Sequence, residues 1–257
     1  LHDALTDGVQ VYLSNGEFYR VVTDLSIPGR GFPFQFTRQY RSQLDYDGPL
    51  GYGWDFNYNA RLKKAGNDIL YFDGSGRLHK YSWNGTGFIT PPGLYNKLEY
   101  NAPNNKYTIT QRNGAVFTFT QNPLETVIYN LQSIRDRHIL NQMYFTYGDN
   151  PNKPGQQYIL LSINDTLSRN ISFVWDANNR LDYFQDWSGR KIDFEYDVNG
   201  DLSSVTSPAA PLDYPNGKIT RYDYYSGNTD ARLNHNLRSI TDPKNQVYLT
   251  NVYDAND

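Results

Sequence analysis

The sequence predicts an all-β fold, built as an extended, curved antiparallel sheet of repeated β-hairpins. Three observations predict it: aromatic side chains supply much of the apolar content, turn dipeptides recur along the chain, and one segment repeats after 21 residues. Among 257 residues there are 23 Tyr, 13 Phe and 4 Trp, against one Met, at Met143. Aromatic residues suit the pleated, half-buried surface of a sheet, so this composition favours strands over helices.

The strands are expected to be short and to be joined by tight turns. Residues 106–111 and 115–120 alternate in polarity, and Asn113-Gly114 lies between them. Asn-Gly supplies the positive φ angles of a type I′ turn, which predicts a β-hairpin here. Further turns are predicted at Asp73-Gly74-Ser75-Gly76, Asn84-Gly85, Ser188-Gly189, Asn199-Gly200 and Asn216-Gly217. At most one brief helical turn is expected, near Arg135 to Leu140, because no stretch of a dozen residues keeps a helical apolar period.

Composition excludes several classes of function. The net charge is -3 and the two signs are interspersed, which leaves no basic stripe for nucleic acid. No run approaches the roughly 18 apolar residues of a membrane-spanning helix, so membrane insertion is not expected. Cysteine is absent. Disulfides, thiolate zinc sites and cysteine nucleophiles are therefore excluded.

Self-comparison shows a repeated unit. Residues 168–181 align with residues 189–202, which places Trp175-Asp176 opposite Tyr196-Asp197, and shorter copies follow further along the chain. The residues that define the repeat are Trp175, Asp176, Gly189, Arg190, Tyr196, Asp197, Tyr222, Asp223, Tyr253 and Asp254. A two-stranded unit cannot bury its own apolar face, so such units are expected to add side by side into one sheet.

Aromatic-Asp, a turn, Gly-Arg and Leu at a period of about twenty residues resemble the YD repeat of the Rhs family, with relatives in Tc toxin complexes and teneurins. The segments 23–34, 37–42 and 51–54 are similar to the opening of Rhs shells. The resemblance implies two continuous regions: residues 1–130 as the Rhs-opening β-sheet region and 131–257 as YD-repeat hairpins.

The resemblance also implies a function. In that family the repeats form a hollow shell around a C-terminal toxin domain, and the protein is exported by a bacterial secretion system. We therefore expect a non-catalytic, encapsulating shell segment without cofactor or metal, secreted or at the cell surface, whose partners are the rest of its own polypeptide and a toxin cargo. An Asp-Pro-x-Gly-type motif and a toxin domain are both missing, which indicates the N-terminal portion of a shell. An unpaired edge strand then predicts self-association.

Other readings remain open at this point. Exposed aromatics could form a carbohydrate-binding platform, for which the candidates are Tyr81, Trp83, Trp175 and Trp187. Arg30, Arg38 and Arg41 lie among aromatic residues and could grip a polyanion, although bridging strands is the favoured role for them. A glycosidase would need two facing carboxylates, and nothing in the spacing of Glu99, Glu125, Asp186 and Glu195 singles out a pair. We therefore do not expect an enzyme.

Metal binding is not expected. The four histidines, His2, His79, His138 and His235, lack the spacing of metal sites. The segment from Asp197 to Asp201 faintly resembles a calcium loop but lacks its glycine and its bidentate glutamate. A solvated hairpin turn is the expected structure there.

Overall fold

The computed structural model describes residues 10–12, 15–138, 140–210 and 212–254. In these residues the chain forms antiparallel strands β1 to β23 and three short 3-10 helices, η1 (Asn57–Asn59), η2 (Ala102–Asn104) and η3 (Ala231–Leu233). None of the helices in this part of the chain is long or apolar enough to cross a membrane. The expectation of an all-β fold with a large curved antiparallel sheet is confirmed.

A small sheet comes first, and we call it the cap sheet. It has the order β1-β2-β3-β6. Its strands are β1 (Gln10–Val11), β2 (Phe18–Ile27), β3 (Phe34–Arg41) and β6 (Trp54–Phe56). Between β3 and β6 the chain forms a short hairpin from β4 (Asp47–Gly48) and β5 (Gly51–Tyr52).

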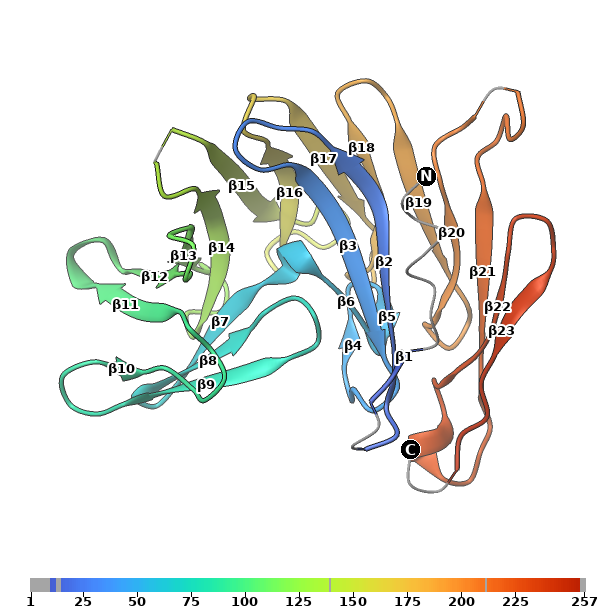
Figure 1. The fold of residues 1–257 in the computed structure, drawn as a ribbon, viewed down its shortest axis with the longest axis horizontal. Helices are drawn as coiled ribbons and strands as arrows, with labels where there is room; N and C mark the ends of the chain where they lie inside the picture. Colours follow the sequence, from blue (N-terminus) through green and yellow to red (C-terminus); the bar gives the residue numbers. More distant parts are fainter. Residues whose placement is uncertain (1–9, 13–14, 139, 211, 255–257) are drawn as a thin grey trace.

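Ten strands, from β14 to β23, follow one another as neighbours in the large sheet, and we call this part the repeat sheet. Each strand pairs antiparallel with the next in sequence. Its strands are β14 (Ile128–Arg135), β15 (Gln142–Asp149), β16 (Tyr158–Asn164), β17 (Asn170–Trp175), β18 (Leu181–Asp186), β19 (Lys191–Tyr196), β20 (Leu202–Thr206), β21 (Ile219–Tyr224), β22 (Leu237–Thr241) and β23 (Val247–Thr250). The sheet curves strongly across this run (Figure 1).

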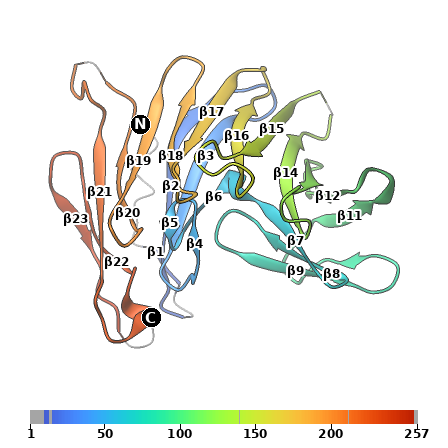
Figure 2. The ribbon, with the colours of Figure 1, turned by 180° about the vertical axis from the view of Figure 1, so that it is seen from behind.

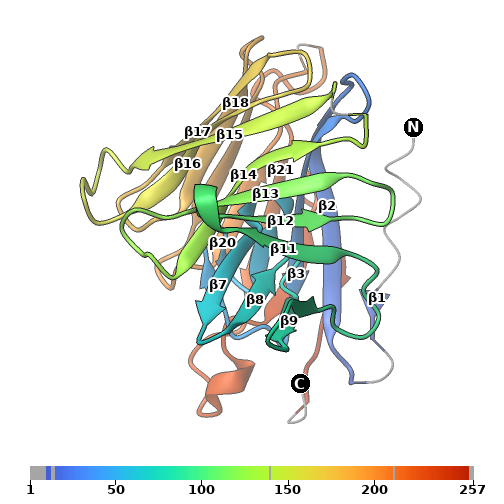
Figure 3. The same cartoon turned by 90° about the vertical axis from the view of Figure 1, so that its left-hand side faces the viewer.

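The sheet forks at β14. One edge of β14 pairs with β13, while its other edge is shared by β7 at 128–130 and by β15 at 133–135. Two stacks of strands extend from opposite edges of β14, as Figure 3 shows from the side. One stack holds β7 (Arg61–Ala65), β8 (Asp68–Phe72), β9 (Leu78–Trp83) and β10 (Phe88–Ile89), and the other holds β11 (Lys97–Asn101), β12 (Lys106–Thr110) and β13 (Val116–Gln121).

Some local expectations hold and others need correction. Strands β12 and β13 form the expected hairpin around Asn113-Gly114. The type I′ assignment is wrong, because Gly114 has a positive φ of 84° and Asn113 does not. The prediction of a helical turn near residues 135–140 is also wrong. Arg135 ends β14, and the Asp136 side chain then accepts a hydrogen bond from the His138 N–H, which favours a turn over a helix; residue 139 lies outside the described residues.

The expected boundary at residue 130 falls inside β14. The chain instead passes from the cap sheet to the forked part of the large sheet between β6 and β7, where η1 lies. Antiparallel hairpins of the large sheet thus also occur before residue 131.

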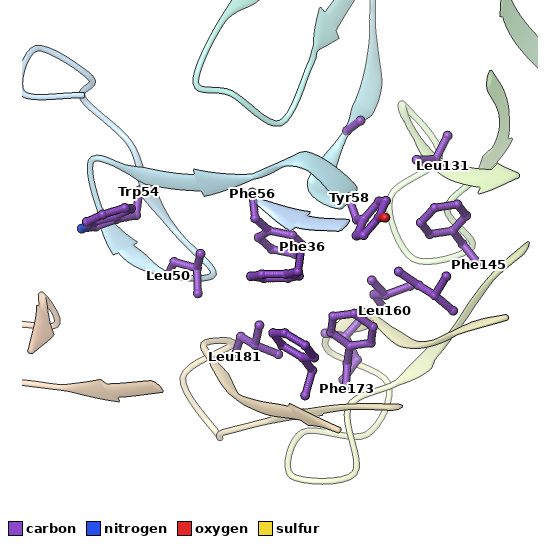
Figure 4. Packing of buried hydrophobic residues seen from close by; sticks show 14 of the residues in the cluster. Phe36, Leu50, Trp54, Phe56, Tyr58, Leu131, Phe145, Leu160, Phe173 and Leu181 are labelled. Carbon is purple, nitrogen blue, oxygen red and sulfur yellow. The ribbon is translucent and has the colours of Figure 1, made fainter. Parts of the chain in front are cut away.

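The core lies where the cap sheet packs on one face of the repeat sheet (Figures 1 and 2). Phe36 is fully buried, and its ring centre lies 4.4 Å from that of Phe184 and 6.0 Å from that of Phe194. Phe56 stacks on the other side of Phe36 at 5.0 Å, an arrangement visible in Figure 4. Burying a phenylalanine contributes about 1.5–3 kcal/mol, so these rings hold the two sheets together.

Candidate functional site

The same turn occurs five times at the ends of the repeat-sheet hairpins. In each, the first residue is Asp, its Oδ1 accepts hydrogen bonds from the backbone N–H groups two and four residues later, and the fourth residue has a φ between 61° and 88°. The first residues are Asp165, Asp176, Asp186, Asp197 and Asp242. The fourth residues are Ser168, Asn179, Gly189, Gly200 and Asn245. The carboxylate thus satisfies turn N–H groups that have no partner in a strand.

The repeat motif maps onto this turn. Trp175 and Tyr196 each end a strand, and Asp176 and Asp197 begin the turns that follow. Gly189 and Arg190 are the fourth and fifth residues of the turn that begins at Asp186. Each 21-residue unit therefore contains two equivalent turns. The sequence analysis predicted the turn at Ser188-Gly189 and placed Asp176 and Asp197 in the repeat motif. The pattern of Asp followed three residues later by Gly, Asn or Ser would also have identified the turns at Asp165 and Asp242.

The later copies of the motif are placed differently. Tyr222 and Asp223 lie inside β21, where Asp223 pairs with Arg238 of β22 instead of capping a turn. Tyr253 follows β23 and donates its hydroxyl hydrogen to the Leu237 carbonyl. Asp254 also lies after β23.

Two of the five turns carry an arginine that pairs with their own aspartate. Arg190 Nη2 lies 2.7 Å from Asp186 Oδ2, and Arg169 Nη2 lies 2.6 Å from Asp165 Oδ2. Burial opposes the ionisation of Asp186, but hydrogen bonds from Ser188 and Arg190 outweigh it, and the pKa of Asp186 is lowered. The Asp186 turn therefore keeps a charged carboxylate inside the edge of the sheet.

A buried charged cluster joins the cap sheet to the repeat sheet. The inward alternation of β3 places Arg38 among its aromatic residues, and the side chain is 1% exposed. Its Nε lies 2.7 Å from Asp24 Oδ2, and its Nη2 donates to the Tyr222 hydroxyl at 2.6 Å. The guanidinium also lies 4.6 Å from the ring centre of Trp54. Burial raises the pKa of Asp24 against the attraction of Arg38.

Neutral hydrogen bonds extend this contact along β21 and β22. Trp54 Nε1 donates to the Tyr224 hydroxyl at 2.9 Å. The hydroxyl of Tyr40 accepts the Leu237 N–H at 2.9 Å and donates to the His235 carbonyl at 3.2 Å. Each of these bonds joins residues at least 170 positions apart, so the first and last parts of the described chain are fixed to each other.

The β4–β5 hairpin inserts into one end of the repeat sheet. The Pro49 carbonyl accepts hydrogen bonds from the Leu181 N–H and the Tyr196 hydroxyl. Gly51 has a φ of 85°, and a Cβ there would lie 2.7 Å from the Gly200 carbonyl oxygen. This close approach requires glycine.

Tyr52 and His235 complete the contact at that end. The two rings stack with centres 3.6 Å apart, and His235 Nδ1 lies 3.0 Å from the buried Asp201 carboxylate. Arg180, the last residue of the Asp176 turn, reaches the same hairpin through the Gly48 carbonyl and Asp47. Turns of the repeat sheet therefore serve as docking points for the cap.

The four candidate platform residues do not share one exposed surface. Tyr81 is fully buried, and Trp175 is buried with its Nε1 bonded to the Leu160 carbonyl. Trp83 and Trp187 are 40% and 45% exposed, on β9 and in the turn after β18. Arg169 lies over the Trp187 ring at 4.2 Å. Only two of the four side chains are thus accessible to a ligand, and they lie on separate elements.

The candidate arginines and acids are also separated. Arg38 is buried, and Arg41 pairs with Glu17; Arg30 is exposed, and its N–H bonds to Thr166 Oγ1. Asp186 caps its turn, and the other candidate acids line three different hollows. They are Glu99, Glu125 and Glu195.

The histidines do not gather. His79 pairs with Asp73 and His138 contacts Arg137, whereas His2 lies outside the described residues. Within the described ranges no three His, Cys, Asp or Glu side chains form a group that could hold a metal ion. The segment from Asp197 to Asp201 is one of the five hairpin turns.

The fold and its contacts define a class of protein: stacked β-hairpins with Asp-capped turns, covered on one face by a smaller sheet. Residues 8–81, which include the whole cap sheet and amount to less than a third of the chain, match a family described as "Domain of unknown function (DUF6531)". No curated protein matches the sequence.

Two solved structures are similar. "Crystal Structure of TcdB2-TccC3" matches with a TM-score of 0.59 and 12% identity, over 85% of this chain and 17% of that one. The N-terminal domain of effector protein SpvB from Salmonella typhimurium strain LT2 matches with a TM-score of 0.39 and 11% identity, over 89% of this chain and 100% of that one. At this identity the first likeness concerns the fold. The chain spans less than a fifth of the TcdB2-TccC3 chain.

Proposed function

We propose that this chain is a non-catalytic segment of an Rhs-type β-sheet shell, in which the cap sheet covers one face and further hairpins continue the sheet beyond β23. One observation carries the proposal. Strand β23 pairs with β22, and among the described residues no register joins its other edge to a strand. The outer edge of a sheet is a template to which another strand can add.

The partners follow from this arrangement and from the sequence resemblance. The strand that continues the sheet belongs to the rest of the same polypeptide, and the enclosed cargo is a C-terminal toxin. The resemblance to the Rhs family and the fold shared with TcdB2-TccC3 support this assignment. Export from a bacterial cell, to the medium or the cell surface, follows from the same resemblance.

The complete reading frame provides the test. We expect residues after 257 to resist protease in the wild-type protein and to become accessible in Phe36→Asp, which places a charge in the cap contact. Val198→Asp, at a fully exposed turn position, is the matched control and retains protection. A reading frame that stops at residue 257, or a downstream segment cleaved equally fast in all three proteins, overturns the encapsulating role.

The free edge has its own test in the 257-residue chain. Asn251 N–H bonds to the Arg238 carbonyl of β22, so the N–H of Thr250 faces the other side. We expect light scattering to give a dimer or larger assembly for the wild-type chain and a monomer for Thr250→Pro, which removes one outward donor. If the wild-type chain is a monomer, the outer edge of β23 is not available for pairing with another strand.

A further inference from the structure

An aromatic groove lies between the stack β7–β10 and the stack β11–β13. Its volume is about 540 Å³, and β9, β10, β11 and β12 all contribute to it. Four rings line it: Trp83, Phe88, Tyr100 and Tyr107. It lies away from the contact between the cap and repeat sheets, so the shell assignment does not use it.

The four rings form a continuous series across the groove. Trp83 meets Phe88 edge to face at 5.0 Å, and Phe88 lies 6.0 Å from Tyr107. Tyr107 in turn lies 4.6 Å from Tyr100. The outer rings, Trp83 and Tyr100, are 40% and 45% exposed, whereas Tyr107 is buried beneath them. The groove thus exposes one ring at each end of the series, Trp83 and Tyr100, and the buried ring of Tyr107 lies between them.

Polar side chains surround these rings. Lys97 and Glu99 of β11 form an ion pair at 2.6 Å, with side chains 71% and 51% exposed. Lys64 and Asn67, from the end of β7 and the following turn, also line the groove. The rim therefore offers ammonium and amide donors together with carboxylate and amide acceptors.

We propose that this groove binds an oligosaccharide of pyranose rings. A pyranose has apolar C–H faces that pack on aromatic rings, and its hydroxyl groups both donate and accept hydrogen bonds, which matches a rim with both kinds of group. A proline-rich peptide also packs on aromatic ladders, but proline has no N–H to donate. Such a peptide offers carbonyl acceptors only, so it could accept from the lysines of the rim but could not donate to its carboxylate and amide oxygens; the saccharide can do both and fits the rim better.

Binding of defined oligosaccharides to the 257-residue chain tests the proposal. The probes are cellohexaose, maltohexaose and the hexamer of N-acetylglucosamine, each at millimolar concentration, followed by isothermal titration calorimetry. We expect at least one to bind and Trp83→Ala and Tyr100→Ala each to weaken that binding by about tenfold or more. Trp187→Ala, which removes an equally exposed tryptophan outside the groove, is the matched control and leaves the affinity unchanged.

Thermal unfolding of the three variants verifies that they fold. Binding of a decaproline peptide with no binding of the sugars overturns the proposal, as does the absence of binding by any probe. Equal loss of affinity in Trp83→Ala and Trp187→Ala also overturns it, because the site would then lie elsewhere. None of these results depends on the cargo or on the free edge of β23, so the proposal fails separately from the shell assignment.

Discussion

Arg38 donates a hydrogen bond of 2.6 Å to the hydroxyl of Tyr222, which lies 184 residues further along the chain. Arg38 belongs to the cap sheet and Tyr222 to the repeat sheet, and Asp24 balances the charge of the guanidinium from a neighbouring cap strand. The contact therefore makes the position of the cap depend on one buried cation.

Replacing that cation is expected to destabilise the protein strongly. Arg38→Met leaves Asp24 buried without its partner, a change that costs about 3–5 kcal/mol of unfolding free energy. Denaturant unfolding measures the loss. Arg238→Met provides a matched control. Arg238 forms an ion pair with Asp223 in which both side chains are about half exposed, and such a pair contributes about 1 kcal/mol or less. Equal losses in the two variants would contradict a special role for the buried pair.

The Asp-capped turns predict a difference between two substitutions at one position. Asp186→Ala removes the acceptor for the N–H groups of Ser188 and Arg190, at a cost of about 1–3 kcal/mol. Asp186→Asn keeps an amide oxygen in the same place and loses mainly the ion pair with Arg190, so its unfolding midpoint should lie closer to wild type. Equal midpoints for the two variants would mean that the turn does not depend on the acceptor.

A side chain at position 51 would collide with neighbouring backbone, whereas a side chain at position 66 would not. Both residues have positive φ, but a Cβ at Gly51 would contact the Gly200 carbonyl, whereas a Cβ at Gly66 would meet no atom within 4 Å. Gly66→Ala should cost about 1–2 kcal/mol from backbone strain alone. Gly51→Ala should cost more, because the β4–β5 hairpin must also move. Thermal unfolding of both variants compares them directly, and a smaller loss at Gly51 would argue against the close packing.

Stability is expected to depend on pH through Asp55. Burial raises the pKa of this carboxyl to about 6, although Arg61 and Asn59 favour its charged form. A raised folded-state pKa stabilises the protein at low pH, and this contribution is lost as the pH rises through about 6. The unfolding free energy of the wild type minus that of Asp55→Asn should therefore fall by about 3 kcal/mol between about pH 4 and about pH 8.

The asparagine variant is the control for every other titrating group. Its residue 55 carries no charge at any pH, while His79, His138 and His235 are present in both proteins and cancel in the difference. Urea unfolding across the pH range gives the two curves. A difference that stays constant, or that grows with pH, would show that Asp55 is not held in the protonated form.

The class of fold could be predicted from the sequence because it depends on short-range patterns. The aromatic content, the turn dipeptides and the repeat of Trp175-Asp176 at Tyr196-Asp197 all report strands and turns within a few residues of each other. The alternation of β19 likewise places Ile192 and Phe194 in the core, as a strand pattern requires.

The contacts between sheets could not be predicted in the same way. Bridging strands was the favoured role for Arg38 as for Arg30 and Arg41, but no local pattern shows that Asp24 and Tyr222 would surround it. Trp175 and Tyr81 were candidates for a ligand surface, yet tertiary packing buries both. The groove beside Trp83 depends on how the consecutive strands β9 to β12 pack against one another, and no pattern within a few residues shows that packing.

The paired Asp turns have a consequence for how the gene can change in length. Consecutive turns lie at opposite ends of the strands, and each 21-residue unit carries one of each kind, from Asp176 to Asp197. Duplication or loss of a whole unit preserves the direction of every later strand, whereas a change of one strand reverses them all. Recombination between repeats can therefore add or remove whole hairpins and leave every later turn at its own end of the sheet. Adding or removing a single strand would move each later turn to the other end.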